Sequence, residues 1–180
     1  GIYAAIYCVI MTAVAMLGFI PIMMPMLCVL VPLLGGIPMM LFMTKVKKFG
    51  MITIYSIIVG LFLWVTGMGY WPFIFGIVFG FIADLIAKSG NYKSSKKTIA
   101  SYAVFSLIIF GNFVPLLINA EEYFLTRQSF GEAYITSLTE IMGNTWLAPL
   151  LAVSCLVCGI IGGFIGKAIL KKHFVKAGIA

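Results

Sequence analysis

The chain has 180 residues, of which 63% are hydrophobic and only 9% are charged, and its mean hydropathy is +1.16. Water-soluble domains carry about a quarter charged residues, so this composition excludes a soluble globular protein and predicts an integral membrane protein. The formal net charge is +7, but the lysines cluster where apolar runs end. That pattern is typical of membrane topology and not of a nucleic-acid-binding face.

The apolar runs predict a bundle of transmembrane helices. A helix needs about 20 apolar residues to cross a hydrocarbon core of about 30 Å, and about six such runs fit into this chain. The runs are continuously apolar and do not alternate, which favours helices over barrel strands. We therefore predict an all-α, six-helix transmembrane bundle that forms a single domain over residues 1–180. The predicted crossings lie at residues 2–19, 24–44, 51–66, 72–87, 99–118 and 147–170.

The chain opens at Gly1 without a Met, and we expect a few residues to precede it. The first apolar run is too long for a removed signal peptide and lacks a cleavage site. Small side chains repeat along this run about every 3.5 residues, at Gly1, Ala5, Cys8, Thr12 and Ala15. In lipid such a stripe lets another helix approach closely, either within the bundle or from a partner protein.

The middle crossings carry helix breakers and interfacial residues. Pro32 and Pro38 flank a Gly-Gly pair in the second crossing, so we expect that helix to bend near its middle, where it either lines a cavity or simply packs. Tyr70 and Trp71 stand in the turn before the fourth crossing, as interfacial anchors or as pocket walls. Asp84 lies one turn from the end of the fourth crossing, where we expect it to pair with Lys88 at i+4.

The last crossing contains four glycines at a spacing that predicts close helix packing. They are Gly159, Gly162, Gly163 and Gly166. We interpret Cys155 and Cys158 in the same run as small packing residues, because this C-x-x-C has no second pair.

The charges predict which end of the bundle faces the cytoplasm. All eleven lysines fall in the connections after crossings two and four or at the C-terminal end, whereas the opposite connections hold one arginine, Arg127. The positive-inside rule therefore places both termini in the cytoplasm. The connection between crossings five and six, from Asn119 to Trp146, then faces outward and carries four of the five acidic residues.

This outer connection is the predicted functional segment. It is long for a helical bundle, where connections run about 2–8 residues, and we interpret it as a folded lid with a helix that begins near Thr136. A solute pocket needs aromatic walls and a few polar groups. The outer ends of the predicted helices supply Tyr70, Trp71, Asn112, Asn119, Glu122, Tyr123, Asn144 and Trp146.

The sequence contains no recognisable catalytic or metal-binding pattern. His173 is the only histidine and lies in the lysine-rich tail, and there is no H-E-x-x-H and no phosphate-binding glycine loop followed by lysine. We therefore expect a non-enzyme without a metal or another cofactor.

Several residue runs resemble a known group of transport proteins. The run Gly80-Phe-Ile-Ala-Asp84-Leu, together with six helices and the small-residue stripe, resembles a substrate-binding S component of an energy-coupling-factor (ECF) transporter. Within that group, three runs are similar to the Trep_Strep membrane family. They are Gly1-Ile-Tyr-Ala-Ala-Ile-Tyr, Lys45-Val-Lys-Lys-Phe-Gly-Met-Ile-Thr and Thr66-Gly-Met-Gly-Tyr-Trp.

The resemblance implies a bacterial uptake system for a vitamin or related micronutrient. In that group the S component associates with a transmembrane T component and two cytoplasmic ATPases, and transport is attributed to toppling of the S component. In that group, docking to the T component uses an Ala-x-x-x-Ala motif on the first helix. The matching small residues in this chain are Gly1 and Ala5, and the resemblance implies a docking face that continues through Cys8 and Thr12. Relatives specific for nickel or cobalt use an N-terminal histidine, which is not found in this sequence, so the resemblance disfavours these metals as substrates. The alternatives are a stand-alone carrier or channel, or an assembly factor that binds no solute.

Overall fold

The computed structural model describes residues 2–20, 22–45, 47–125, 131–143, 146–174 and 176. Its described residues form helices joined by short turns, and none of them forms a strand. The α-helices are α1 (Ile2–Ala15), α2 (Met23–Lys45), α3 (Met51–Leu63), α4 (Trp71–Ser89), α5 (Ser95–Phe105), α6 (Leu107–Gly111), α7 (Val114–Ile118), α8 (Ala120–Leu125), α9 (Glu132–Met142) and α10 (Leu147–Ile169). A 3-10 turn, η1 (Met16–Phe19), continues α1, and π turns extend α3 and α10, namely η2 (Trp64–Met68) and η4 (Leu170–Phe174).

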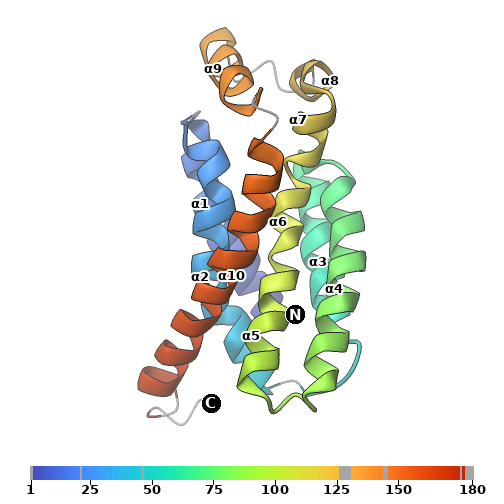
Figure 1. Cartoon of the computed structure of the whole chain (residues 1–180), viewed down its shortest axis with the longest axis vertical. Helices are drawn as coiled ribbons and strands as arrows, with labels where there is room; N and C mark the ends of the chain where they lie inside the picture. The colour runs from blue at the N-terminus through green and yellow to red at the C-terminus, as the bar shows by residue number, and fades with distance from the viewer. Residues whose placement is uncertain are drawn as a thin grey trace.

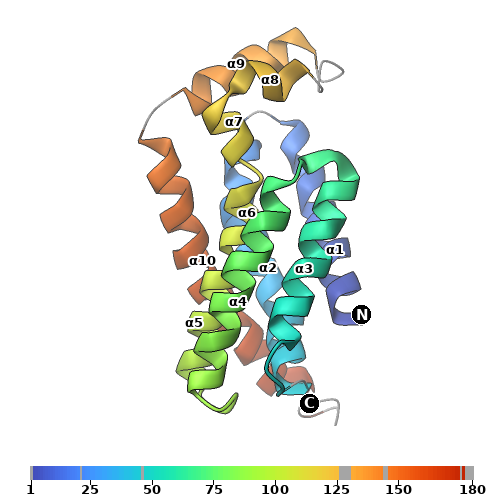
Figure 2. The same ribbon diagram turned by 90° about the vertical axis from the view of Figure 1, so that its right-hand side faces the viewer.

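The helices form an elongated bundle with a cap at one end (Figures 1 and 2). Helices α1, α2, α3, α4, the α5–α7 run and α10 lie along the long axis, whereas α8 and α9 lie across the end where α10 begins. The most extensive packing joins α10 to α2, α3 to α4 and α4 to α5. The fold confirms the all-helical prediction and places α8 and α9 over one end of the bundle.

Three of the described helices are long and apolar enough to span a membrane. They cover Met26–Lys45, Trp71–Ser89 and Leu147–His173. Two shorter apolar helices cover Ile2–Ala15 and Met51–Thr66. These spans confirm an integral membrane architecture, and the count of six crossings stays a prediction.

The fifth predicted crossing is built from three consecutive helices. It begins at Ser95 and not at Ile99, because the Ser94 side chain caps α5 by accepting a hydrogen bond from the Lys97 N–H at 3.4 Å. The run is interrupted at Ser106 and again at Asn112–Phe113, before Pro115. Proline has no N–H to continue a helix, which accounts for the break before α7.

Glycines bring the backbones of α2 and α10 into direct contact, as the sequence predicts. A Cβ atom at Gly162 would overlap the carbonyl oxygen of Pro32, and one at Gly166 would overlap the carbonyl oxygen of Gly36. Gly159 faces α5 in the same way, against the backbone of Ala103, and Gly163 packs against the Ile99 side chain. The glycine stripe thus seats α10 between α2 and α5.

The core between the helices is rich in aromatic side chains. The rings of Tyr7, Tyr55 and Phe105 meet edge to face with centroids 5.5–5.9 Å apart, and Phe42 packs against Tyr55 at 4.7 Å. The Tyr102 hydroxyl donates to the carbonyl of Pro32 at 2.5 Å, inside the second predicted crossing. Helix α2 continues through both of its internal prolines, and this hydrogen bond ties its middle to α5.

Charges are separated between the two ends of the bundle. The lysines lie at the end of α2, in the α2–α3 and α4–α5 connections, in the first turn of α5, at the ends of α4 and α10, and in the residues that follow α10. Glu121, Glu122, Glu132 and Glu140 lie on α8 and α9 at the other end. The structure therefore keeps the separation on which the predicted topology depends.

Candidate functional site

The predicted lid is folded onto the bundle. Tyr123 and Phe124 of α8 are 5% and 6% exposed and join the hydrophobic core, as does the fully buried Leu138 of α9. Burial raises the pKa of Tyr134 on α9, and the nearby Tyr123 adds to this effect. Helices α8 and α9 both lie across the same end of the bundle (Figures 1 and 2).

Helix α9 is longer than predicted. It begins at Glu132 and not near Thr136, following Gly131, whose φ of +90° suits a glycine. The Thr139 hydroxyl donates to the Ile135 carbonyl within the helix at 2.7 Å. Thr136, near which the sequence predicts the start of this helix, is therefore an interior position of α9.

Asn119 and Glu122 form a helix-capping pair at the start of α8. The Asn119 side-chain oxygen accepts a hydrogen bond from the Glu122 N–H at 3.3 Å, and its amide nitrogen donates to the Glu122 carboxylate at 3.4 Å. This reciprocal arrangement satisfies free groups at a helix start. Both residues are exposed, so they present a carboxylate and an amide at the capped end in a fixed orientation.

The predicted aromatic walls lie where α4 and α10 begin. Tyr70 and Trp71 stack with ring centroids 5.5 Å apart and planes inclined by 24°, and Tyr70 is 52% exposed. Trp146 directly precedes α10 and is 61% exposed. These rings are accessible at the capped end, whereas Tyr123 is buried beneath it.

Asn112 has a buried acceptor without a donor. It lies in the break between α6 and α7, and its side-chain oxygen is buried with no hydrogen-bond partner among the described residues. An unsatisfied buried polar group costs about 1–3 kcal/mol. Such a group gains stability from any ligand or water that donates a hydrogen bond to it. Asn144 and Arg127, in the same predicted segment, lie outside the described residues.

The predicted docking stripe borders an apolar hollow on α1. The hollow has a volume of about 610 Å³, and its lining is completed by Ile58 and Phe62 of α3. The residues of α1 that line it are Ala5, Cys8, Val9, Thr12 and Ala13. The Thr12 hydroxyl donates to the Cys8 carbonyl at 2.8 Å, so this hydroxyl is not an unsatisfied donor facing lipid or protein. Gly1 lies outside the described residues.

The sequence did not reveal a second hollow at the lysine-rich end. It has a volume of about 300 Å³ and lies among α2, α5, α10 and the α4–α5 connection. Lys47, Lys93 and Lys167 contribute to its lining. In the sequence the lysines indicate membrane topology, and their spacing along the chain gives no indication that these three meet.

Asp84 has different partners from the one predicted. Its carboxylate accepts hydrogen bonds from Gly50, Thr53 and Tyr92. The Lys88 ammonium lies over the Phe49 ring, 4.6 Å from the centroid. The predicted i, i+4 ion pair is therefore wrong, because Gly50 in the α2–α3 connection and Thr53 in the first turn of α3 supply donors close to the carboxylate.

Apolar helices of membrane-spanning length, with the described charged residues confined to the two ends of their bundle, define an integral membrane protein. The chain belongs to the Trep_Strep family, described as a hypothetical bacterial integral membrane protein, whose sequence profile matches residues 1–176. No match was found among curated proteins, and none among solved structures.

Proposed function

We propose that this protein is the substrate-binding S component of an ECF transporter in the bacterial plasma membrane. It captures a vitamin or related micronutrient outside the cell, and a T component and two cytoplasmic ATPases complete the importer. In this proposal ATP hydrolysis belongs to the partner subunits alone, and the chain needs no cofactor. Membership of a bacterial integral membrane family is consistent with a transport role.

The apolar hollow on α1 is the observation that carries the proposal. Ala5, Thr12 and Ala13 are exposed in the described structure and leave room for close approach of another helix. Association of helices in lipid depends on van der Waals packing, which small residues favour. The proposed occupant is an apolar transmembrane helix of the T component, which matches the docking face that the resemblance implies.

The distribution of charge supports an outward-facing binding site. By the positive-inside rule, the lysine-rich end lies in the cytoplasm with both termini, and α8 and α9 face outward. The proposed site combines the exposed rings of Tyr70 and Trp146 and the half-buried ring of Trp71 with the Asn119–Glu122 pair. The unpaired side-chain oxygen of Asn112 adds a hydrogen-bond acceptor.

Affinity purification from native membranes tests the proposal. Tagged protein should recover a T component and two ATPases, and solute uptake in liposomes should require all of them together with ATP. A stand-alone carrier or channel instead predicts solute flux through the purified chain alone. That result would overturn the S-component assignment.

The solute can be identified by mass spectrometry of small molecules that co-purify with the protein. Replacing Trp71 with Ala should then lower the affinity for that molecule. The matched control is Lys48→Ala at the opposite end, which should leave the affinity unchanged. Equal affinities for both variants and the wild type would remove the aromatic wall from the proposed site.

A further inference from the structure

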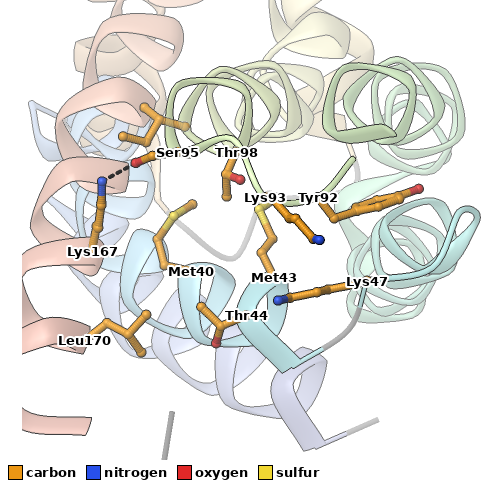
Figure 3. A pocket seen from close by; sticks show the side chains of 11 residues that line it. Met40, Met43, Thr44, Lys47, Tyr92, Lys93, Ser95, Thr98, Lys167 and Leu170 are labelled. Atoms are coloured by element: carbon orange, nitrogen blue, oxygen red, sulfur yellow. Dashed lines mark hydrogen bonds between the residues drawn. The ribbon is translucent and has the colours of Figure 1, made fainter. Parts of the chain in front are cut away.

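The hollow at the lysine-rich end concentrates positive charge without a negative counterpart. Figure 3 shows Lys47 just after α2, Lys93 in the α4–α5 connection and Lys167 on α10 around one space. No acidic residue is among those that line it. Asp84 is the only carboxylate side chain in residues 1–120 and 147–180, and its described hydrogen bonds go to Gly50, Thr53 and Tyr92.

The hydrogen-bonding groups of the hollow are arranged to donate. Lys167 donates to the Ser95 hydroxyl oxygen, which leaves the Ser95 proton and two Lys167 protons for a ligand. Lys47 and Lys93 have no acceptor among the described residues. By contrast, the hydroxyl protons of Thr44 and Thr98 are committed to the carbonyls of Leu41 and Ser94. A ligand rich in acceptor oxygens therefore fits this set of groups.

The α4–α5 connection holds its part of the hollow in an uncommon backbone conformation. Asn91 and Tyr92 have φ of +51° and +58°, a region that non-glycine residues seldom adopt. The Tyr92 hydroxyl is tied to Asp84 at 3.2 Å. This contact fixes the segment from which Lys93 projects.

An apolar groove continues from the hollow along the outer face of the bundle. The groove has a volume of about 460 Å³ and shares Ser95, Ile99 and Lys167 with the hollow. Its remaining lining includes Ala100 on α5 together with Ile160 and Phe164 on α10. Ile160 and Phe164 are 42% and 60% exposed, on helices that belong to the membrane-spanning part of the chain.

We propose that the hollow and the groove together bind an anionic phospholipid. The lysines and Ser95 hold the phosphate oxygens of the headgroup, and the groove holds an acyl chain between α5 and α10. Basic pockets between transmembrane helices are suited to such headgroups. This site lies at the end opposite α8 and α9 and is independent of the proposed solute site.

Native mass spectrometry of the delipidated protein tests the proposal with phosphatidylglycerol and phosphatidylcholine as probes. The protein should retain phosphatidylglycerol in preference to phosphatidylcholine. The triple variant Lys47→Gln, Lys93→Gln, Lys167→Gln should weaken its binding on the order of 100-fold, or about fivefold for each lysine. The matched control is Lys48→Gln, Lys171→Gln, Lys172→Gln, which removes the same charge from the same end and should retain the lipid. Equal losses in both triple variants would overturn the site.

Two further experiments distinguish binding of a lipid from binding of free phosphate. Inorganic phosphate should not displace phosphatidylglycerol at equal concentration, and displacement would overturn the lipid assignment. Ala100→Trp should fill the groove and weaken phosphatidylglycerol binding, whereas Leu150→Trp, elsewhere on the apolar surface of α10, should not. Unchanged binding by the Ala100→Trp variant would likewise contradict a bound acyl chain.

Discussion

The carboxylate of Asp84 on α4 accepts a hydrogen bond from the backbone N–H of Gly50, 2.6 Å away, at the start of α3. The same oxygen accepts from the Thr53 hydroxyl at 3.1 Å, and the other oxygen accepts from Tyr92 at 3.2 Å. Asp84 is fully buried, and a negative charge at a helix N-terminus is favourable. One side chain therefore joins the end of α4 to both neighbouring connections.

Replacing Asp84 with Asn should destabilise the fold. In the variant, a side-chain N–H would face one of the groups that now donate a hydrogen bond to the carboxylate. Hydrogen bonds to a charged group contribute about 1.5–3 kcal/mol to stability. We expect a loss of about 2–3 kcal/mol, measured as a lower melting temperature in detergent. The exposed Glu140 on α9 provides the control, since Glu140→Gln should leave the melting temperature unchanged. Equal melting temperatures for the Asp84→Asn variant and the wild type would refute the role of Asp84.

Tyr92 should make stability depend on pH in the alkaline range. Its burial, followed by the negative charge of Asp84 and their hydrogen bond, raises the pKa of Tyr92 to about 12. The folded protein therefore holds this proton more tightly than the unfolded chain, whose tyrosine pKa is about 10. The contribution of protonated Tyr92 to the free energy of unfolding is therefore complete below about pH 10 and is lost as pH rises toward about 12.

Comparing the wild type with Tyr92→Phe isolates this contribution from the other titrating groups. The stability difference between the two proteins should shrink as pH rises through that window. Difference absorbance should show a tyrosinate that forms in the wild type near pH 12 and is missing in the variant. If the absorbance difference between the two proteins instead had its titration midpoint near pH 10, that result would contradict the Asp84–Tyr92 contact.

Gly162→Ala should disrupt the α2–α10 interface. The added methyl group would meet the backbone of Pro32 and Leu33, which cannot rotate away as a side chain can. Overpacking in a tight core costs about 1–3 kcal/mol, and we expect the upper part of that range, measured by thermal unfolding. Ala168→Val, at an exposed position on the same helix, is the control. Equal stability of the Gly162→Ala variant and the wild type would show that the helices are not in close contact.

The sequence predicts much of this fold because membrane helices follow from composition and spacing. The glycine stripe of α10 and the end-to-end separation of lysines and glutamates are visible from residue positions alone. The sequence suggests Lys88 as the partner of Asp84 because the two lie one helical turn apart, whereas Gly50 approaches Asp84 only in the tertiary fold. The lysine hollow was missed for the same reason, since Lys47, Lys93 and Lys167 come from three distant segments. Asn119 and Glu122 were predicted as binding residues, and their mutual capping contact could be identified only from the structure.

Ala5→Trp should weaken association with a partner and leave the fold intact. Ala5 is exposed at the edge of the α1 hollow, so a large ring there occupies the space proposed for a partner helix without entering the core. Co-purification of the T component should fall at least about tenfold, which corresponds to about 1.4 kcal/mol. Val153→Trp, at a 55% exposed position on α10, should not change assembly. Assembly unchanged by Ala5→Trp would exclude the α1 hollow as the docking face.

Sidedness can be measured by labelling single cysteines in intact cells. The four native cysteines are buried and can be replaced by Ala to give a background for Glu132→Cys on α9 and Lys96→Cys on α5, both at exposed positions. A maleimide that cannot cross the bilayer should label the Glu132→Cys variant and spare the Lys96→Cys variant until the cells are lysed. Labelling of Lys96→Cys with protection of Glu132→Cys would invert the protein in the membrane and contradict capture of a solute from outside the cell.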